Sequence, residues 1–241
     1  MAVAKSQGKR TPSKAVFATA LMGVVLLFSY ALSLSRRRSS SAAADPNAAL
    51  QQTTSGGSGN KEWQALLETR VCGSPAVDGY AHVKPECLEG SPTNQWWQQH
   101  KPTPDDLDVH IERAADYDGL AVGWGIGNTK ASIEECAEAC RQHVPKGPSI
   151  GPFGNLPCNA FAFCAFDTCF EPDAHSHSKG DCWLKFTEAP ASPEVNMRGR
   201  LPLALQQRHP AAPKEVQWHA GVLLPHGVTL TNGSWSPRHS W

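Results

Sequence analysis

The chain has 241 residues with 22 basic and 22 acidic side chains, so its formal net charge at neutral pH is zero. This balance gives no global sign of nucleic-acid binding, which usually accompanies a basic surface. The 19 prolines, the 20 glycines and an aromatic content of 8% favour a loop-rich structure over one large apolar core. Eight cysteines indicate either disulfide bonds in an oxidising compartment or metal binding in the cytosol.

The N-terminus predicts a membrane anchor. Residues 1–14 carry four basic side chains and no acid, and residues 15–34 then run without a charge. About twenty helical residues span roughly 30 Å, the thickness of the hydrocarbon core, whereas the apolar part of a cleaved signal peptide has only about 7–15 residues. We therefore expect a cytoplasmic tail (1–14) and an uncleaved signal anchor (15–35), with cleavage near Ser33 as the alternative.

The orientation of this anchor follows from charge and from cysteine. Four Lys or Arg residues precede the apolar run and three arginines follow it, which weakly favours a cytoplasmic N-terminus. A cysteine-rich region after the anchor requires the lumen or the exterior if its thiols are oxidised. The expected protein is single-pass, with its C-terminal part lumenal or extracellular, in the Golgi, the endoplasmic reticulum or the plasma membrane.

Three segments with different expected roles follow the anchor. Residues 36–60 are Gly/Ser-rich in their second half and predict a flexible stalk. In residues 61–71 the apolar set Trp63, Leu66, Leu67 and Val71 fits one face of a helix. Beyond it, Cys72 and Cys87 flank a loop containing Gly and Pro, and we expect a local disulfide between them.

Residues 89–110 are polar and Pro-rich, which predicts a connector that completes a segment from 61 to 115. Trp96 and Trp97 within it fit an exposed platform for a sugar ring or a peptide. The alternative, that both pack against the neighbouring domain, is favoured, since large aromatic side chains are usually buried.

The expected folded domain starts at Asp116. The run Gly119–Gly127 has apolar alternation and predicts a short strand broken by glycine. Ser132, with Glu135 three residues later, forms the capping-box pattern that starts a helix. Cys136 and Cys140 lie four residues apart and therefore project from one face of that helix.

Two further strands are predicted from alternation. In residues 158–164, Ala160 and Ala162 face one way with Cys164, while Phe161 and Phe163 face the other. In residues 181–186, the side chains of Cys182, Leu184 and Phe186 share one side. Cys164 and Cys169 enclose a tight turn, and the polar residues 171–180 predict a flexible loop.

This arrangement resembles the PAN/Apple domain family. The resemblance rests on the helix with Cys136 and Cys140, on the strand motif Cys-x-Ala-Phe-x-Phe of residues 158–163, and on the Cys-Trp-Leu motif of residues 182–184. Residues 218–222 are similar to the closing strand of such domains, so the resemblance covers about residues 116–224. It implies an α+β fold in which one helix, stapled by disulfides, covers an antiparallel sheet.

The resemblance also implies a disulfide pairing. Nested bonds would join Cys140 to Cys158 and Cys136 to Cys182, and pairing Cys164 with Cys169 is the simplest completion. Six cysteines permit 15 pairings, so arithmetic alone does not choose among them. The chain departs from the family in a long insertion after Phe186, residues 187–214, and this leaves the place of the last strand open.

The C-terminal tail, residues 225–241, contains Asn232-Gly-Ser234, an N-glycosylation sequon that agrees with a lumenal tail.

Zinc is the rival interpretation of the cysteines. His175 and His177 lie between Cys169 and Cys182 in sequence, and both residue types bind zinc. The spacing of Cys164 and Cys169 is unlike that of zinc motifs, and the expected compartment is oxidising, so we expect no bound metal.

Catalysis has little sequence support. The chain lacks the Gly-x-Ser-x-Gly, His-Glu-x-x-His and P-loop motifs, so neither a catalytic residue nor a cofactor is expected. The triplets Asp106-Leu-Asp108 and Asp116-Tyr-Asp118 have the Asp-x-Asp form used by many glycosyltransferases, but the triplet is common by chance.

Two functions remain. The first is a membrane-tethered module that binds protein or carbohydrate, with ligand contacts among Trp96, Trp97, Trp124 and Trp183, although each of these is equally explained as core. The second is an accessory subunit or divergent enzyme of glycan processing in the secretory pathway.

Overall fold

In the computed structural model the described residues are 56–73, 84–147, 154–231 and 234–235. All of them lie in the unit that starts at Thr54. The expected cytoplasmic tail, the anchor (15–35), most of the stalk and the sequon residue Asn232 lie outside the described residues. Within the described part of the chain, no helix combines the length and the apolar character needed to cross a bilayer.

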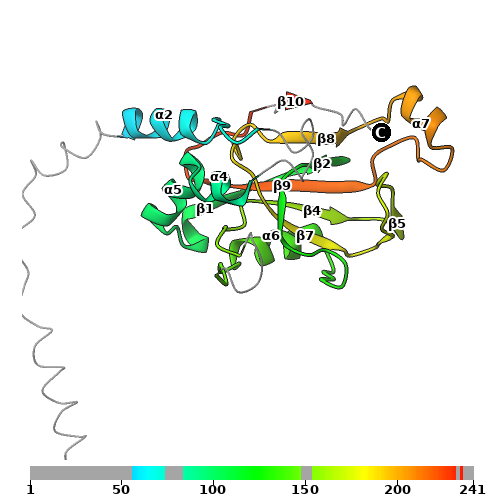
Figure 1. The fold of residues 1–241 in the computed structure, drawn as a ribbon, viewed down its shortest axis with the longest axis horizontal. Helices are drawn as coiled ribbons and strands as arrows, with labels where there is room; N and C mark the ends of the chain where they lie inside the picture. The colour runs from blue at the N-terminus through cyan, green and yellow to red at the C-terminus, as the bar shows by residue number, and fades with distance from the viewer. Residues whose placement is uncertain (1–55, 74–83, 148–153, 232–233, 236–241) are drawn as a thin grey trace, which may run out of the picture. The chain divides into compact units, whose positions relative to one another are not determined.

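A five-stranded antiparallel sheet is the centre of the fold (Figure 1). We call it the main sheet, and each strand in it is hydrogen-bonded antiparallel to its neighbours. Its strands, in spatial order, are β1 (Leu107–Arg113), β9 (Trp218–Pro225), β4 (Ala160–Cys164), β7 (Cys182–Phe186) and β3 (Leu120–Gly123). The expected α+β class with an antiparallel sheet is confirmed.

Strand β4 lies in the middle of the main sheet and shows the predicted alternation. Phe161 and Phe163 belong to the core on one face, whereas Ala160 and Ala162 belong to cores on the other. All five residues of the strand are buried. Because the second face presents alanine, another layer can approach it closely.

Helix α6 (Ile133–Arg141) covers the phenylalanine face of the main sheet. Its start was predicted correctly, because the Oγ of Ser132 accepts a hydrogen bond of 3.3 Å from the backbone N–H of Glu135. The reciprocal half of the capping box differs, since the Glu135 carboxylate accepts from the N–H of Ala131 instead of Ser132. Acidic residues in the first turn and Arg141 in the last complement the helix dipole.

Four disulfides join the eight cysteines in the pairs that the sequence analysis expected. The bonds Cys136–Cys182 and Cys140–Cys158 tie α6 to β7 and to the residues just before β4. The bond Cys164–Cys169 closes the turn after β4. The helix is thus covalently fixed at two points one turn apart.

A second, smaller sheet lies on the alanine face of the main sheet (Figure 1). It contains β2 (Ala115–Tyr117), antiparallel to β8 (Glu194–Arg198), which pairs in parallel with β10 (Ser234–Trp235). Strand β8 and helix α7 (Leu203–Arg208) both come from the insertion of residues 187–214. The insertion therefore supplies the middle strand of the second sheet, and the last strand of the main sheet, β9, lies between β1 and β4.

A charged group links the two sheets at one end. The guanidinium of Arg198 donates two hydrogen bonds, of 2.5 and 2.8 Å, to the carboxylate of Glu112 on β1. The hydroxyl of Tyr117 donates to the same carboxylate at 2.5 Å. Burial raises the pKa of Tyr117 above its usual value, and the neighbouring Glu112 raises it further.

The expected boundary of the folded domain at residue 116 is wrong, because β1 begins at Leu107 and pairs with β9 along its whole length. The predicted connector 89–110 is also mostly ordered. It contains helix α5 (Pro92–His100) and the 3₁₀ turn η3 (Pro104–Asp106). Strand β1 is an edge strand whose polar side chains are only half-buried, so its sequence lacks the apolar signal of a central strand.

The N-terminal helices pack onto the same body. Helix α2 runs from Gly56 to Leu66, five residues earlier than the predicted start at residue 61, so the end of the predicted flexible stalk is helical. Leu67 is fully buried against the second sheet, whereas Val71, predicted on the same apolar face, is 57% exposed because the helix ends before it. Helix α4 (Pro85–Glu89) follows and leads into α5.

Glu188 fixes the Cys72 segment to the end of β7. Its carboxylate accepts hydrogen bonds from the backbone N–H groups of Val71 and Cys72, at 3.2 and 3.0 Å. Its main-chain oxygen accepts a hydrogen bond from the hydroxyl of Thr93. Burial raises the pKa of Glu188, although the two backbone donors oppose that rise. Residues 61–73 and 84–115 therefore belong to the folded body.

Candidate functional site

A cavity of about 490 Å³ opens on the alanine face of the main sheet. Its walls come from β2, β3, β4, β7, β8 and β9, from β6 (His177–Ser178), and from the loop that joins β6 to β5 (Thr168–Cys169). Volumes of about 300–1,000 Å³ are typical of sites for small ligands. The two sheets and the loop meet here, so we call it the inter-sheet cavity.

Tryptophan side chains form one side of the inter-sheet cavity. Trp124 follows β3 and is 55% exposed, and its ring lies 4.4 Å from that of Trp183, centroid to centroid, at 64°. The ring of His175 meets Trp124 edge-on at 5.5 Å. These rings offer an aromatic surface to a ligand, and the ring of Trp124 remains open to solvent.

Gly125 allows this arrangement of rings. A Cβ atom at residue 125 would lie 2.2 Å from the ring atoms of Trp183, closer than any non-bonded contact permits. The predicted strand 119–127 is shorter in the structure, ending at Gly123, and residues after it turn away from the sheet. The glycine-rich sequence therefore lets the indole of Trp183 lie against the backbone.

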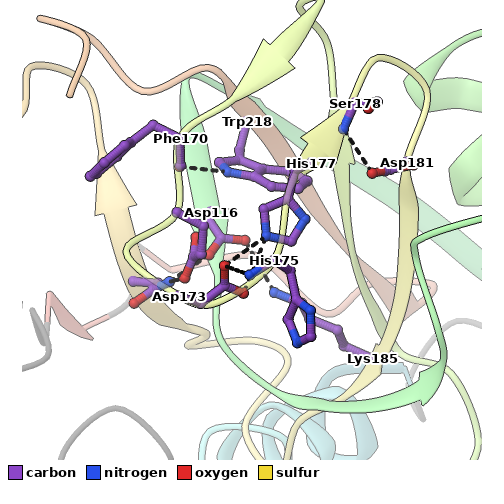
Figure 2. Close-up of polar contacts among 11 residues, drawn as sticks. Asp116, Phe170, Asp173, His175, His177, Ser178, Asp181, Lys185 and Trp218 are labelled. Atoms are coloured by element: carbon purple, nitrogen blue, oxygen red, sulfur yellow. Dashed lines mark hydrogen bonds and ion pairs between the residues drawn. The ribbon is translucent and has the colours of Figure 1, made fainter. Parts of the chain in front are cut away.

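His177 is a buried polar residue in the cavity wall (Figure 2). Its Nε2 lies 3.2 Å from an oxygen of the Asp173 carboxylate. Its ring meets Trp218 edge-on at 5.1 Å and Trp183 at 5.9 Å. Its other nitrogen, Nδ1, is buried without a hydrogen-bond partner among the described residues.

The deepest polar group of the cavity is built around Lys185. Its ammonium donates to the carboxylate of Asp116 at 3.1 Å and to the carbonyl of Tyr117 at 2.5 Å, as Figure 2 shows for Asp116. The amide nitrogen of Asn196 donates to Asp116 at 2.6 Å and to Glu171 at 3.2 Å. Lys185, Asp116 and Asn196 are all buried, so this group is held in a medium of low polarity.

The loop over the cavity is held at several points. The indole N–H of Trp218 donates to the carbonyl of Phe170 at 3.0 Å (Figure 2). Cys169 pairs with His177 across β5 and β6 and is bonded to Cys164. The sequence predicted a flexible loop at 171–180, but it contains β6 and the buried His177 instead.

Of the four tryptophans predicted as ligand contacts, only Trp124 and Trp183 line the cavity. Trp96 is 5% exposed and stacks on His100 at 4.7 Å, with Trp63 edge-on at 5.8 Å. Trp97 packs against the core under α6. The favoured interpretation, that Trp96 and Trp97 pack against the neighbouring domain, is therefore the one that the structure bears out, because both rings pack α5 on the domain.

All four carboxylates of the two Asp-x-Asp triplets already have partners within the chain. Asp106 accepts from the backbone and hydroxyl of Thr103, and these hydrogen bonds lower the pKa of Asp106. Asp108 pairs with His226 at 2.9 Å, and Asp116 pairs with Lys185. Asp118 accepts from the backbone of Gly119 at 2.8 Å.

The cysteines that the zinc interpretation would need as ligands are not free thiols. Cys164, Cys169 and Cys182 are all in disulfide bonds, which leaves no thiolate beside His175 and His177. Within the described residues no group of three or more His, Cys, Asp or Glu side chains is arranged to hold a metal ion.

Sequence reasoning missed Asp173, Lys185 and Asn196 as members of the site. Lys185 had a usable signal, because a charged residue at the fourth position of an apolar strand needs a buried partner. Asn196 had no such signal, since it belongs to the insertion, whose place in the fold the sequence did not determine. Asp173 was hidden in a polar loop.

Comparison of the chain with protein-family models, with curated proteins and with solved structures finds no match.

Proposed function

We propose that this chain is a recognition module held at a membrane of the secretory pathway, with its folded part on the lumenal or extracellular side. Its ligand site is the inter-sheet cavity, which takes a single chemical group of a protein or carbohydrate partner. The observation that carries the proposal is the cavity of about 490 Å³ with Trp124 exposed at its side.

The compartment is supported by the cysteines. All eight form disulfides, two of them buried between α6 and the main sheet. Such bonds persist in the secretory pathway and outside the cell, whereas cytosolic thiols stay reduced. Together with the apolar run of residues 15–34, this favours a signal anchor with the folded part beyond it.

A PAN/Apple-like fold is part of the proposal. It is supported by α6 lying over an antiparallel sheet and by the nested bonds Cys136–Cys182 and Cys140–Cys158. The insertion adds β8, the middle strand of the second sheet, to that plan. The second sheet matters for function because Asp116 on β2 and Asn196 on β8 reach the cavity from it.

The experiment is a binding screen of the full-length chain on glycan and secreted-protein arrays, compared with Trp124→Ala. Removing an aromatic contact at the centre of an interface commonly costs about 2 kcal/mol or more, roughly 30-fold in affinity. We expect saturable binding that Trp124→Ala weakens at least about tenfold. Because Trp124 is more than half exposed, its truncation should leave folding intact.

Leu203→Ala is the matched control. Leu203 is 70% exposed on α7 and does not line the cavity, so its truncation removes a similar exposed apolar side chain elsewhere. If Trp124→Ala binds the ligand with the same affinity as the wild type, the ligand site lies outside the cavity.

The topology has its own test. If the C-terminal tail is lumenal, Asn232 is available for glycosylation, and PNGase F should increase the electrophoretic mobility of the wild type but not of Asn232→Gln. A wild-type chain that keeps its mobility after treatment and is fully digested by protease added to sealed microsomes would show a cytosolic tail instead.

A further inference from the structure

The chemistry of the inter-sheet cavity is biased toward hydrogen-bond acceptors. The first such acceptor belongs to Asn196. Its amide nitrogen donates to the carboxylates of Asp116 and Glu171, which fixes the orientation of the amide, because the reverse orientation would set its oxygen against two carboxylates. Its Oδ1 is then an acceptor, and it is buried without a donor among the described residues.

His177 provides a second acceptor of the same kind. Its Nε2 faces the Asp173 carboxylate and therefore carries the proton that it donates. In the neutral imidazole the other nitrogen, Nδ1, holds a lone pair. This atom is also buried without a donor in the described part of the chain, and the residue is 5% exposed. Asn196 and the neutral form of His177 thus each carry one buried acceptor without a donor among the described residues, and both residues line the cavity.

Asp173 adds negative charge at the opening. Its side chain is 32% exposed, and its partners are the backbone N–H of His175 and the ring of His177. No Lys or Arg pairs with it among the described residues. The one Lys in the cavity wall, Lys185, is already bonded to Asp116 and to the carbonyl of Tyr117.

The remaining walls are aromatic and aliphatic. The rings of Trp124 and Trp183 are inclined at 64° to each other, which forms a corner with two π-faces. Cations bind to such faces, most strongly to tryptophan. The walls also contain four aliphatic side chains: Leu120, Ala121, Ala162 and Ala174.

From these features we infer that the inter-sheet cavity binds the side chain of a lysine on a protein partner. Its ammonium supplies hydrogen-bond donors and positive charge, and its four-carbon stem suits the apolar walls. An anion would meet carboxylates and unpaired acceptors, and a quaternary ammonium would bring charge without donors.

This inference rests on the proposed function, since it names the ligand group of the same cavity. The probe is Nα-acetyl-lysine N-methylamide, titrated into the full-length chain and followed by tryptophan fluorescence and calorimetry. The comparison compounds are the norleucine, Nε-acetyl-lysine and Nε-trimethyl-lysine analogues, which keep the stem and change only the head group. One charge-assisted hydrogen bond is worth about tenfold in affinity or more. We expect the lysine probe to bind at least tenfold more tightly than each analogue.

Two variants locate the binding. Asp173→Asn removes one charge and keeps an oxygen that can accept from His175 and His177, so it should weaken the lysine probe by about three- to tenfold. Asp167→Asn is the matched control, because Asp167 is an exposed carboxylate in the same segment that does not line the cavity. It should leave the affinity unchanged.

Three results would overturn the inference. The first is equal affinity for lysine and trimethyl-lysine, which would mean that donors are not required. The second is equal weakening by Asp173→Asn and Asp167→Asn, which would mean that binding depends on the overall negative charge of the protein and not on a carboxylate in the cavity. The third is binding of D-glucosamine or D-glucose, lost in Trp124→Ala, without lysine binding; in that case the cavity is still the ligand site and the proposed function stands. If neither lysine nor any array ligand binds, both fail together.

Discussion

The indole of Trp183 lies directly against the backbone of Gly125, so close that a methyl group on that glycine would fall 2.2 Å from the ring. Trp183 in turn holds the exposed ring of Trp124 at its edge. A residue without a side chain thus sets the position of both rings in the candidate site.

Gly125→Ala should therefore displace Trp183 and destabilise the fold by about 1–3 kcal/mol, the usual cost of adding a methyl group to a filled site. Near-ultraviolet circular dichroism reports the change in the tryptophan environment, and urea unfolding reports the stability. Gly90→Ala is the control, because its nearest neighbours lie 3.4 Å or more from the added carbon and its φ of −83° suits alanine. Equal effects of the two substitutions would contradict the contact.

Disulfides of different loop length should differ in their contribution to stability. The Cys136–Cys182 bond closes 46 residues and the Cys164–Cys169 bond closes 5. In the chain-entropy model these loops correspond to about 4 and about 2 kcal/mol. We expect the double alanine variant of Cys136 and Cys182 to lose about twice as much stability in urea as that of Cys164 and Cys169. The reverse order would show that native contacts, rather than loop closure, dominate.

Breaking the buried ion pair of Lys185 and Asp116 from one side should be costly. Lys185→Met leaves the Asp116 carboxylate buried with only the amide of Asn196, and loss of one partner of such a pair costs about 3–5 kcal/mol. Adding Asp116→Asn to that variant should recover part of the loss. Arg113→Met, which removes the exposed pair with Glu134, should cost less than about 1 kcal/mol. Urea unfolding of these variants measures each step.

His226 should titrate above the usual histidine range. Its Nδ1 faces the Asp108 carboxylate at 2.9 Å and its Nε2 faces the carbonyl of Asp105 at 2.7 Å, so the protonated ring satisfies both acceptors. The hydrogen bond to Asp108 raises the pKa of His226 most. NMR titration of the ring protons should return it toward 6.5 in Asp108→Asn but not in Asp105→Asn.

The sign of the linked stability follows from that raised pKa. The stabilisation by His226 is fully present below pH 6.5, where the unfolded chain is protonated as well, and it is lost as the pH rises through the higher folded pKa. In Asp108→Asn the pKa of His226 should stay closer to 6.5, so this loss of stability above pH 6.5 should be smaller.

Local rules predicted the start of α6 and the two faces of β4. Ser132 starts α6 because a serine oxygen satisfies a free backbone N–H at that position, and this depends only on nearby residues. The two faces of Phe161 and Ala162 follow from the period of a strand. The disulfide pairs needed a resemblance as well, because spacing alone leaves them open.

Long-range pairing could not be predicted in the same way. The strand Leu107–Arg113 is an edge strand, and its Asp, His and Glu residues fit a connector as well as a half-solvated strand. Strand β8 contains Glu194 and Asn196, whose burial depends on partners in β2 and in the loop before β6. The site is formed by segments that are far apart in the sequence, so no single stretch contains a motif that predicts it.

Asp116, Lys185 and Asn196 come from three different strands. Asp116 bonds to Lys185, 69 residues away in the sequence, and to Asn196, 80 residues away. A ligand held by this group adds its binding energy to the folded state of all three strands at once. Occupancy should therefore slow amide exchange in β8 even though most of that strand touches no ligand. The rate of amide exchange in β8, the strand that the insertion supplies, would thus indicate whether the cavity is filled.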